Sequence, residues 1–514
     1  MPTIFTTLQS HAKKSKPRKP KGQILLKAPL TAQRLPGIGA QLTSVARSAV
    51  PKRKKVKKPR PRLSLVDRFK IIGQPHPRLH VIVIGGGFGG LSTAYELQTV
   101  GYKVTLVEAQ KRVGGRVLSQ DDVVRGEVME GGAELIGLNH PAWWSYKHKF
   151  DLHFTRLSNP KNSPIILAGV SLDNDAARKL HCEMSRAVRL INRIARRVNA
   201  DQPWTTRSAK KLDHCSLVGG LKSIPMSRLC RLAFLEQLQA DNGVKAARQS
   251  WLGNLAMIKG GGLGKFWTDT ETHHCTGGNQ QLAERFTSVL RKVILGRRVQ
   301  EIRIDGNYAE VILKGRKKPL VGSDVVLAIP PSLWWGKEAI RFKPPLPKAC
   351  RVQFGQNVKY LLSVRKGCWK PKGPNMSSDG PIDLTWEGTG GQPGARAGLV
   401  AFSGAKNALV CRRWKDRKKE YLDKLSPIYP RIRTGSRNGL FMDWPGNKWT
   451  RGSYSFPKPG EVTRVGPLLR LGIQDTLHFA GEHTCYAFTG YMEAALQSGL
   501  RVAEHLARRD GVIP

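Results

Sequence analysis

An apolar run that ends in a cluster of glycines constrains this 514-residue chain more than any other feature. Val81–Ile84 is an unbroken β-branched run, which is typical of a strand buried on both faces. Gly85, Gly87 and Gly90 follow at G-x-G-x-x-G spacing, just before a run of helix-forming residues. The first glycine permits a tight turn, the second lets a pyrophosphate approach the backbone, and the third allows close helix–strand packing.

A second strand and its terminal acid complete a dinucleotide-binding unit. Val104–Val107 is another apolar run, and Glu108 ends it 23 positions after Gly85. An acid at this place contacts ribose hydroxyls, while the N-terminus of the intervening helix offers unpaired N–H groups to phosphates. The sequence therefore predicts a dinucleotide site, and later motifs have to decide which dinucleotide it binds.

Those motifs carry a family resemblance. E-A-x-x-R-V-G-G-R spans Glu108–Arg116, an A-G-E segment ends at Glu482, and G-Y-M-E-A spans Gly490–Ala494. With these motifs in this order, residues 78–507 resemble the flavin-containing amine oxidase family, which includes monoamine and L-amino acid oxidases. The resemblance implies an α/β fold with a Rossmann-like FAD-binding domain and a second, mixed α+β substrate domain.

The resemblance also implies a set of residues that contact FAD. They are Gly85, Gly87, Phe88, Gly89, Gly90, Glu108, Ala109, Arg112, Gly115, Arg116, Gly132, Ala133, Glu134, Val299, Trp449, Gly481, Glu482, Gly490, Tyr491 and Met492. Gln110 stands where relatives often have an arginine beside the adenosine ribose, so one charged contact is expected to be absent. Ser453 replaces the cysteine that bonds the flavin in monoamine oxidases, which predicts noncovalent FAD.

The same resemblance implies domains that are discontinuous along the chain. We expect an FAD-binding domain from residues 76–150, 271–330 and 446–514, a helical part of the substrate domain at 151–270, its sheet part at 331–445, and a basic disordered arm at 1–75.

Three residues are candidates for the catalytic site. In this family the flavin takes a hydride from the carbon beside nitrogen, and the protein supplies orientation and electrostatics. Tyr454 and Tyr491 match the two aromatics that flank the substrate nitrogen in monoamine oxidases, although both also suit a core. Lys337 resembles the family lysine that holds a water near flavin N5. Its offset from Pro330-Pro331 and from Phe342 leaves a surface position open.

Glu134 bears on the substrate. L-amino acid oxidases place an arginine near this segment to bind the substrate carboxylate, whereas a glutamate would repel a carboxylate and favour a cationic group. An amine is therefore expected rather than an α-amino acid, unless Glu134 binds backbone amides. The implied reaction takes an amine, O2 and water to an aldehyde or keto acid, ammonia and hydrogen peroxide.

Bulk properties fit a large flavoenzyme of the cytoplasm. No apolar run approaches the roughly 20 residues of a membrane helix, and no secretory signal is recognisable. Eight cysteines without a CxxC pair indicate reduced thiols rather than a disulfide framework.

The formal charge of +49 is unusual for such an enzyme. Met1–Val66 holds 17 Lys and Arg and no Asp or Glu, and its Pro- and Ser-interleaved basic runs predict the disordered arm. The rest of the chain still carries +32, so an anionic partner or surface is an open alternative to a solvated tail.

Other interpretations of the sequence stay open. The same FAD architecture serves carotenoid desaturases and protoporphyrinogen oxidases, and the basic chain also suits a nucleic-acid-associated flavoprotein or a flavin-binding protein without turnover. Cys182–Val198 suits an amphipathic substrate-domain helix better than a membrane-surface helix. His273, His274 and Cys275 lack a second ligand cluster, so we expect no metal.

Overall fold

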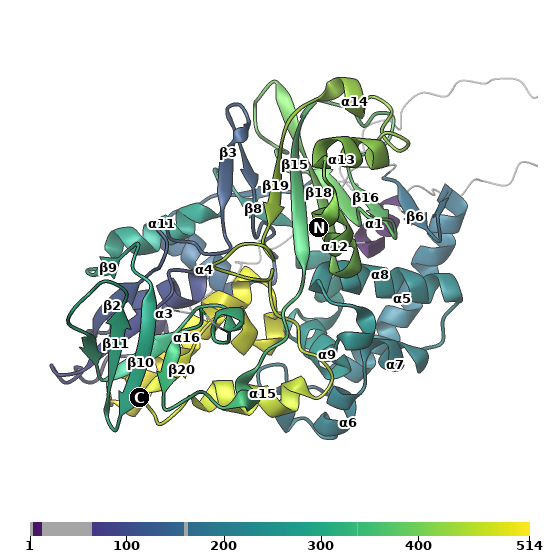
Figure 1. Cartoon of the computed structure of the whole chain (residues 1–514). Coiled ribbons are helices and arrows are strands. Elements are labelled where there is room, and N and C mark those ends of the chain that lie inside the picture. The colour runs from purple at the N-terminus through teal and green to yellow at the C-terminus, as the bar shows by residue number, and fades with distance from the viewer. Residues whose placement is uncertain (1–3, 13–63, 159–162, 337) are drawn as a thin grey trace, which may run out of the picture. The chain divides into compact units, whose positions relative to one another are not determined.

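The computed structural model describes residues 4–12, 64–158, 163–336 and 338–514. Figure 1 shows these residues as a ribbon, coloured from the N-terminus to the C-terminus. Among them, no helix is both long and apolar enough to cross a bilayer.

A parallel sheet forms around the strand that precedes the glycines. Its order is β20-β13-β1-β2-β9, and every neighbouring pair runs parallel. The strands are β1 (His80–Ile84), β2 (Lys103–Val107), β9 (Val293–Ile294), β13 (Asp324–Leu327) and β20 (Leu477–Phe479). Four of the five residues in β1 are buried, as the unbroken apolar run predicted. Strands distant in sequence thus meet in one sheet, and the predicted α/β fold class is confirmed.

Two long helices cover this sheet. Helix α3 (Phe88–Thr99) follows the glycines, and α16 (Met492–Arg509) packs along it (Figure 1). The two helices approach closely at Gly499, because a Cβ there would lie 2.6 Å from the carbonyl oxygen of Gly89. The resulting apolar core includes Val83, Leu91 and Leu496.

The largest sheet of the described residues has seven strands. Its order is β19-β15-β18-β17-β16-β6-β7. The strands are β6 (Ile165–Leu167), β7 (Val170–Ser171), β15 (Asn357–Arg365), β16 (Met376–Ser378), β17 (Leu384–Glu387), β18 (Arg396–Gly404) and β19 (Ser436–Asp443). The helices α12 (Ala405–Arg413), α13 (Arg417–Leu425) and α14 (Ile432–Gly435) lie beside it (Figure 1).

Three smaller sheets are also present among the described residues. A four-stranded sheet has the order β12-β11-β10-β14, and β3 pairs with β4 as β5 pairs with β8. The strands are β3 (Ser119–Val124), β4 (Glu127–Glu130), β5 (Phe154–Arg156), β8 (His273–Cys275), β10 (Val299–Asp305), β11 (Tyr308–Leu313), β12 (Leu320–Gly322) and β14 (Arg341–Lys343).

The middle of the chain is helical, as its periodicity predicted. The helices are α4 (Pro141–Lys149), α5 (Asn174–Ala195), α6 (Ala209–His214), α7 (Leu217–Lys222), α8 (Arg228–Asn242), α9 (Trp251–Gly260), α10 (Phe266–Asp269) and α11 (Gln280–Val289). Asp173 caps α5 by accepting hydrogen bonds from the N–H groups of Asp175 and Ala176. The apolar face of α5, with Met184 and Ile191, is buried in the core, which supports the substrate-domain interpretation of this helix.

The first described residues differ from the predicted arm. Ile4–Ala12 forms helix α1, and Ile4, Phe5 and Leu8 are buried against the helical core that includes α5. These apolar side chains precede the first basic run, so a short hydrophobic helix can form where average composition predicts disorder. Residues 13–63, with both basic runs, lie outside the described residues.

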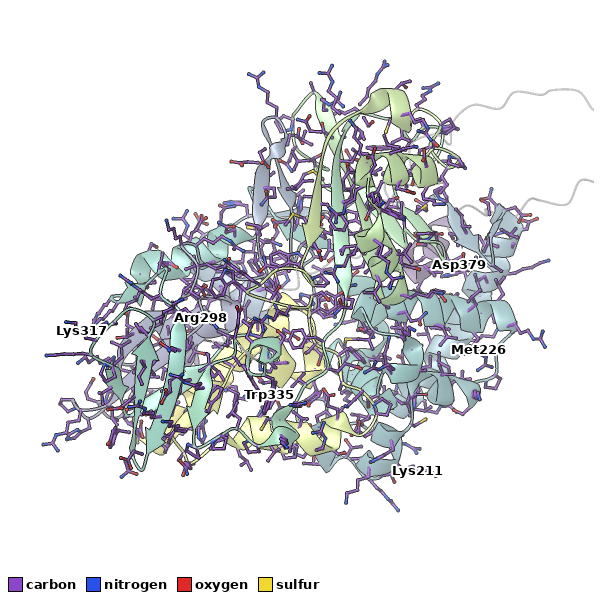
Figure 2. All side chains as sticks on the ribbon, in the orientation of Figure 1. Lys211, Met226, Arg298, Lys317, Trp335 and Asp379 are labelled. Atoms are coloured by element: carbon purple, nitrogen blue, oxygen red, sulfur yellow. The ribbon has the colours of Figure 1, made fainter. Side chains whose placement is uncertain are left out.

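Positive charge is also carried by the body of the chain. Lys211 on α6 and Lys317 in the turn between β11 and β12 point away from the ribbon (Figure 2). The exposed face of α5 adds further cations, among them Arg186, Arg189 and Arg193.

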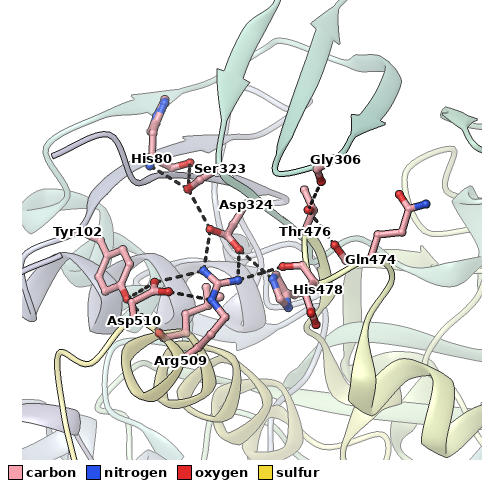
Figure 3. Close-up of polar contacts among 12 residues, drawn as sticks. His80, Tyr102, Gly306, Ser323, Asp324, Gln474, Thr476, His478, Arg509 and Asp510 are labelled. Atoms are coloured by element: carbon pink, nitrogen blue, oxygen red, sulfur yellow. Dashed lines mark hydrogen bonds and ion pairs between the residues drawn. The ribbon is translucent and has the colours of Figure 1, made fainter. Parts of the chain in front are cut away.

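A buried polar network stabilises the parallel sheet at the beginning of β13. The Asp324 carboxylate accepts hydrogen bonds from both Arg509 Nη atoms at 2.8 and 3.1 Å, and it lies 3.0 Å from His478 Nε2 (Figure 3). These contacts lower the pKa of Asp324 despite its burial, so its charge is paired. Since β13 begins here and the chain reaches the cavity wall only at Ala328, directly after β13, the network supports the fold from the opposite end of the sheet.

Candidate active site

A cavity of about 740 Å³ begins at the carboxyl ends of the parallel strands. Its wall is built from segments that are far apart in the chain, and its volume falls within the range of small-molecule sites. The predicted cofactor and catalytic residues in this wall are Gly85, Gly87, Phe88, Gly89, Glu108, Ala109, Gly115, Arg116, Gly132, Ala133, Glu134, Val299, Trp449, Tyr454, Gly481, Glu482, Gly490, Tyr491 and Met492.

The glycine turn shapes one end of this cavity. Gly85 has φ +113°, and a Cβ there would lie 2.7 Å from the carbonyl oxygen of Ala328. Gly87 faces open space, because no atom lies within 4 Å of a Cβ built on it. Helix α3 begins immediately after Gly87, so its first-turn N–H groups point toward this space and meet no helical acceptor. An anionic group can therefore approach the backbone here.

Two predicted cofactor contacts lie behind the cavity wall rather than in it. A Cβ on Gly90 would lie 2.0 Å from the carbonyl oxygen of Gly85, so Gly90 is needed for packing of α3 on β1. Arg112 donates hydrogen bonds to the carbonyls of Val113 and Gly115, at 3.1 and 2.7 Å, and thereby holds the loop that follows β2.

Glu108 ends β2 at the edge of the cavity. Its carboxylate accepts hydrogen bonds from the N–H groups of Gly86 at 2.6 Å and Gln110 at 2.8 Å. Burial raises the pKa of Glu108, and these hydrogen bonds oppose the shift. The acid is thus held against the glycine turn, as a ribose contact requires.

Glu482 connects the motifs at the centre of the site. Its carboxylate forms an ion pair with Arg116 Nη1 at 3.0 Å and accepts hydrogen bonds from the N–H groups of Ser455 at 3.0 Å and Gly490 at 3.1 Å. Ser455 Oγ also donates to it at 2.7 Å. Since Ser455 follows Tyr454 and Gly490 precedes Tyr491, this one buried carboxylate fixes both tyrosine segments.

The two tyrosines meet at the other end of the cavity. Tyr454 Oη donates to the backbone carbonyl of Asp241 at 2.6 Å, and Tyr491 Oη donates to Glu271 Oε1 at 3.0 Å. A Cβ on Gly490 would lie 3.2 Å from Tyr454 Cδ2, so the two segments are in contact. Burial and the nearby carboxylates raise the pKa of both phenols well above the usual value, which keeps both rings neutral.

Comparisons with known proteins agree with this arrangement. The sequence profile of the flavin-containing amine oxidoreductases matches residues 88–507. The chain belongs to that family. It is 26% identical, over 85% of its length and 98% of the relative's, to a flavin-containing monoamine oxidase of Mycobacterium tuberculosis. It is 27% identical, over 84% of its length and 87% of the relative's, to amine oxidase B of Homo sapiens.

Solved structures of amine oxidases share the fold. Cyclohexylamine oxidase from Brevibacterium oxydans superposes with a TM-score of 0.76 at 22% identity, over 84% of this chain and 99% of that one. Putrescine oxidase superposes with a TM-score of 0.75 at 22% identity, over the same shares of the two chains.

The residues present fit the flavin of this amine oxidoreductase family. Open space at Gly87, the N-terminus of α3 and the acid at Glu108 suit the phosphates and ribose of a dinucleotide. From there the wall of the same cavity continues to Trp449 and the two tyrosines. Trp449 lines the cavity, and its contact with the flavin stays a prediction.

Glu134 has a partner that the sequence did not reveal. Lys359 on β15 forms a buried ion pair with it, with Nζ 2.7 Å from Glu134 Oε2, and Trp386 Nε1 donates to Oε1 at 2.8 Å. Glu134 therefore binds side chains rather than backbone amides. Because the pair is close to neutral, Glu134 does not repel a substrate carboxylate, and the expected preference for a cationic substrate does not follow from this residue.

Three further sequence predictions concern Lys337, Ser453 and a metal site. Lys337 lies outside the described residues, so its role stays a prediction. Ser453 lines the cavity and donates a hydrogen bond to Asn357 Oδ1 at 2.6 Å. His273 and His274 belong to β8, which pairs with β5, and no group of side chains in the described part of the chain is arranged to hold a metal ion.

Sequence reasoning missed much of the wall. The missed residues include Asp241, Asn242, Glu271, Arg297, Arg298, Lys314, Asn357, Lys359, Trp386 and Trp444. Of these residues, only Arg297 and Arg298 could have been expected in the wall from the sequence, because they directly precede the predicted cofactor contact Val299. Asp241 and Glu271 lie in segments without a nucleotide motif, and nothing local distinguishes them from surface acids.

Proposed function

We propose that this protein is an FAD-dependent amine oxidase that converts a primary or secondary amine, or an amino acid, to an aldehyde or keto acid, with release of ammonia or, from a secondary amine, of a primary amine. A hydride, which carries two electrons, leaves the carbon beside nitrogen, water hydrolyses the resulting imine, and O2 takes up the two electrons and two protons to give hydrogen peroxide. Bound flavin would supply the hydride acceptor for this chemistry.

One observation carries the proposal. The turn at Gly85 and Gly87 with the first residues of α3, here called the glycine cradle, lines the same cavity as the two tyrosines, and Glu482 connects them. Arg116 from the cradle side and the segments of Tyr454 and Tyr491 all bind this carboxylate. A desaturase, or a protein that only binds flavin, does not need a pair of neutral tyrosines at the end of the cavity that lies away from the glycine cradle.

The tyrosines have a simple task in this reaction. Their rings offer apolar walls that hold an uncharged amine in one orientation and limit access of water. Since their hydroxyl groups are fixed to Asp241 and Glu271, the rings cannot rotate freely when a substrate binds. The raised phenol pKa values mean that no phenolate forms to compete for protons.

We propose that FAD is bound noncovalently. None of the eight cysteines, all of which are described and free, lines the cavity. Ser453 carries a hydroxyl at the position before Tyr454 and cannot form a thioether. Backbone N–H groups, Glu108 and Glu482 would hold the cofactor instead.

The visible spectrum of the purified protein tests both statements. We expect a flavin band that bleaches when an amine is added without oxygen, returns on admission of air with formation of peroxide, and passes into the supernatant after acid precipitation. A band unchanged by every amine and amino acid would overturn amine oxidation. Colour that stays with the acid-precipitated protein would overturn noncovalent binding.

A further inference from the structure

A row of cations covers the exposed face of α5 and of the turn that ends this helix. The side chains are exposed to solvent and belong neither to the wall of the cavity nor to the apolar core. The members of this row, here called the α5 basic row, are Lys179, Arg186, Arg189, Arg193, Arg196 and Arg197. Amine oxidation as proposed gives them no task.

The spacing of the row follows from the period of the helix. Arg186, Arg189 and Arg193 succeed one another at intervals of three and four residues, so they lie one above the other on the same side of α5. Neighbouring members are about 5–6 Å apart along the helix axis, and the part from Lys179 to Arg193 is about 21 Å long. The row is therefore a line of charge rather than a compact cluster.

The acids of the same segment do not neutralise the row. Three acids lie within residues 174–211. Each is bound to a residue outside the row: Asp175 to Arg178, Glu183 to Ser227 and Asp201 to Arg470. In the part of the chain that the structure describes, no side chain of the row forms an ion pair. These charges are available to a partner.

Neighbouring elements extend the positive surface at the C-terminal end of α5. Lys259, near the end of α9, donates a hydrogen bond from Nζ to the backbone oxygen of Arg196 at 3.2 Å. Lys265 is exposed on the short helix η3 (Leu263–Lys265), which packs against α5. The surface at this end is thus built from three elements.

The row does not serve the helix itself. Like charges three and four residues apart repel each other and destabilise a helix. Cations in the last turn are stabilised by the helix dipole, but Lys179, Arg186 and Arg189 lie before that turn. The buried face of α5, with Met184 and Ile191, holds the helix in place against this repulsion. A bound polyanion would relieve it.

The geometry favours phosphates of a nucleic acid as that polyanion. Guanidinium groups donate paired hydrogen bonds to phosphate oxygens, and a line of them matches a series of phosphates. A helix that lies on a membrane inserts its apolar face into lipid, whereas the apolar face of α5 is buried in the protein. Helix α5 has no Phe, Tyr or Trp that could stack on bases.

We infer that the α5 basic row binds the phosphate backbone of nucleic acid independently of base sequence. This binding surface lies outside the cavity and does not rest on the proposed amine oxidation. It also gives a task to part of the positive charge that the body of the chain carries.

Two full-length variants that lose the same charge test the inference. The row variant is Arg186→Gln/Arg189→Gln/Arg193→Gln, and the turn variant, in the exposed turn between β11 and β12, is Arg316→Gln/Lys317→Gln/Lys318→Gln. Both keep the basic segment at 13–63, so a difference between them comes from α5. The probe is a random-sequence DNA duplex of about 20 base pairs, which is longer than the row.

Fluorescence anisotropy over a series of NaCl concentrations gives Kd and its dependence on salt. Each phosphate contact contributes about 0.9 to the slope of log K against log salt, so the row variant should lose about 2–3 of this slope. At physiological ionic strength its affinity should fall by about tenfold or more, while the turn variant should stay within about twofold of wild type. Equal losses in both variants, or no loss in the row variant, would overturn the inference.

A conservative variant separates charge from fold. Lysines at the three substituted positions of α5 keep the charge and should keep the wild-type salt slope. A slope as low as that of the row variant would overturn the role of charge. Circular dichroism should match wild type in every variant, because all substituted side chains are exposed.

Anionic vesicles test the competing partner. Vesicles that contain phosphatidylserine should bind the row variant and the turn variant equally. Loss of vesicle binding in the row variant with unchanged DNA binding would assign the row to a membrane surface and overturn the inference. These measurements use no amine, so a failure of the proposed oxidation would leave their outcome unaffected.

Discussion

The two ends of the cavity recognise their ligands in different ways. The cofactor end consists largely of backbone, with Gly85 and Gly87 in one turn and the first N–H groups of α3 beside them. The amine end consists of side chains from α8, from the segment after α10, from β15 and from the two tyrosine segments. Phosphates can be bound by a short local motif, whereas a specific amine needs charges and rings from several elements.

Substituting the glycines around the start of α3 should have the largest effect, because a side chain at one of them, Gly90, should prevent folding. Gly87→Val adds a side chain in empty space at a residue with φ −80°, so the chain should still fold. Its affinity for flavin should fall by about tenfold or more, which corresponds to about 1.4 kcal/mol of binding free energy. Flavin absorbance per protein, together with circular dichroism, measures this. Gly90→Val is the matched contrast, because its Cβ would lie 2.0 Å from the Gly85 carbonyl and should prevent folding. A Gly87→Val protein with full flavin content would contradict the cradle.

Removal of the Glu482 carboxylate should affect both ends at once. Glu482→Ala leaves Arg116 and the N–H groups of Ser455 and Gly490 without their acceptor, at a cost of about 3–5 kcal/mol in the free energy of unfolding. Urea denaturation of the holoprotein measures it. Asp201→Ala breaks an exposed ion pair with Arg470 and should cost no more than about 1 kcal/mol. Similar losses in both variants would argue against Glu482 as the connection between the two ends.

Changes at Tyr491 should act on the amine end alone. Tyr491→Leu removes the ring, and we expect kcat/KM for the best amine to fall by about tenfold to a hundredfold, or about 1.4–2.7 kcal/mol. Tyr491→Phe keeps the ring, loses only the hydrogen bond to Glu271, and should stay within about a few-fold of wild type. Flavin content should be unchanged in both. Equal losses in the two variants would show that the hydroxyl rather than the ring is needed.

The smallest effect should appear in a buried acid outside both ends of the cavity. Burial raises the pKa of Asp383, beside β17, to about 8 from its usual 3.8. Between these values the folded chain binds more protons here than the unfolded chain, so the stability contributed by the protonated form is full below about pH 4 and lost as the pH rises to about 8. Compared with wild type, Asp383→Asn should therefore gain about 1 kcal/mol or more in relative stability across this range. Unfolding at pH 5 and pH 9 measures it, and a difference independent of pH would contradict the buried, neutral carboxyl.

The sequence predicted the fold class and the cofactor end because both depend on local rules. An apolar run, a turn with positive φ at Gly85 and a helix that begins at Phe88 are each visible within twenty residues of sequence. The order of later motifs identified Glu482, Tyr454 and Tyr491 through the family resemblance, and all three line the cavity with the cradle.

The tertiary structure decided which charges meet. Glu134 looked like a free acid until β15 brought Lys359 to 2.7 Å, and Asp241 looked like one helix residue among many until α8 placed it beside Tyr454. Pairing of such residues depends on strand register and helix packing over more than 200 positions of sequence, which no local pattern encodes. By itself the sequence therefore determined the fold class and the dinucleotide motif, while tertiary packing decided which charged side chains meet in the cavity wall.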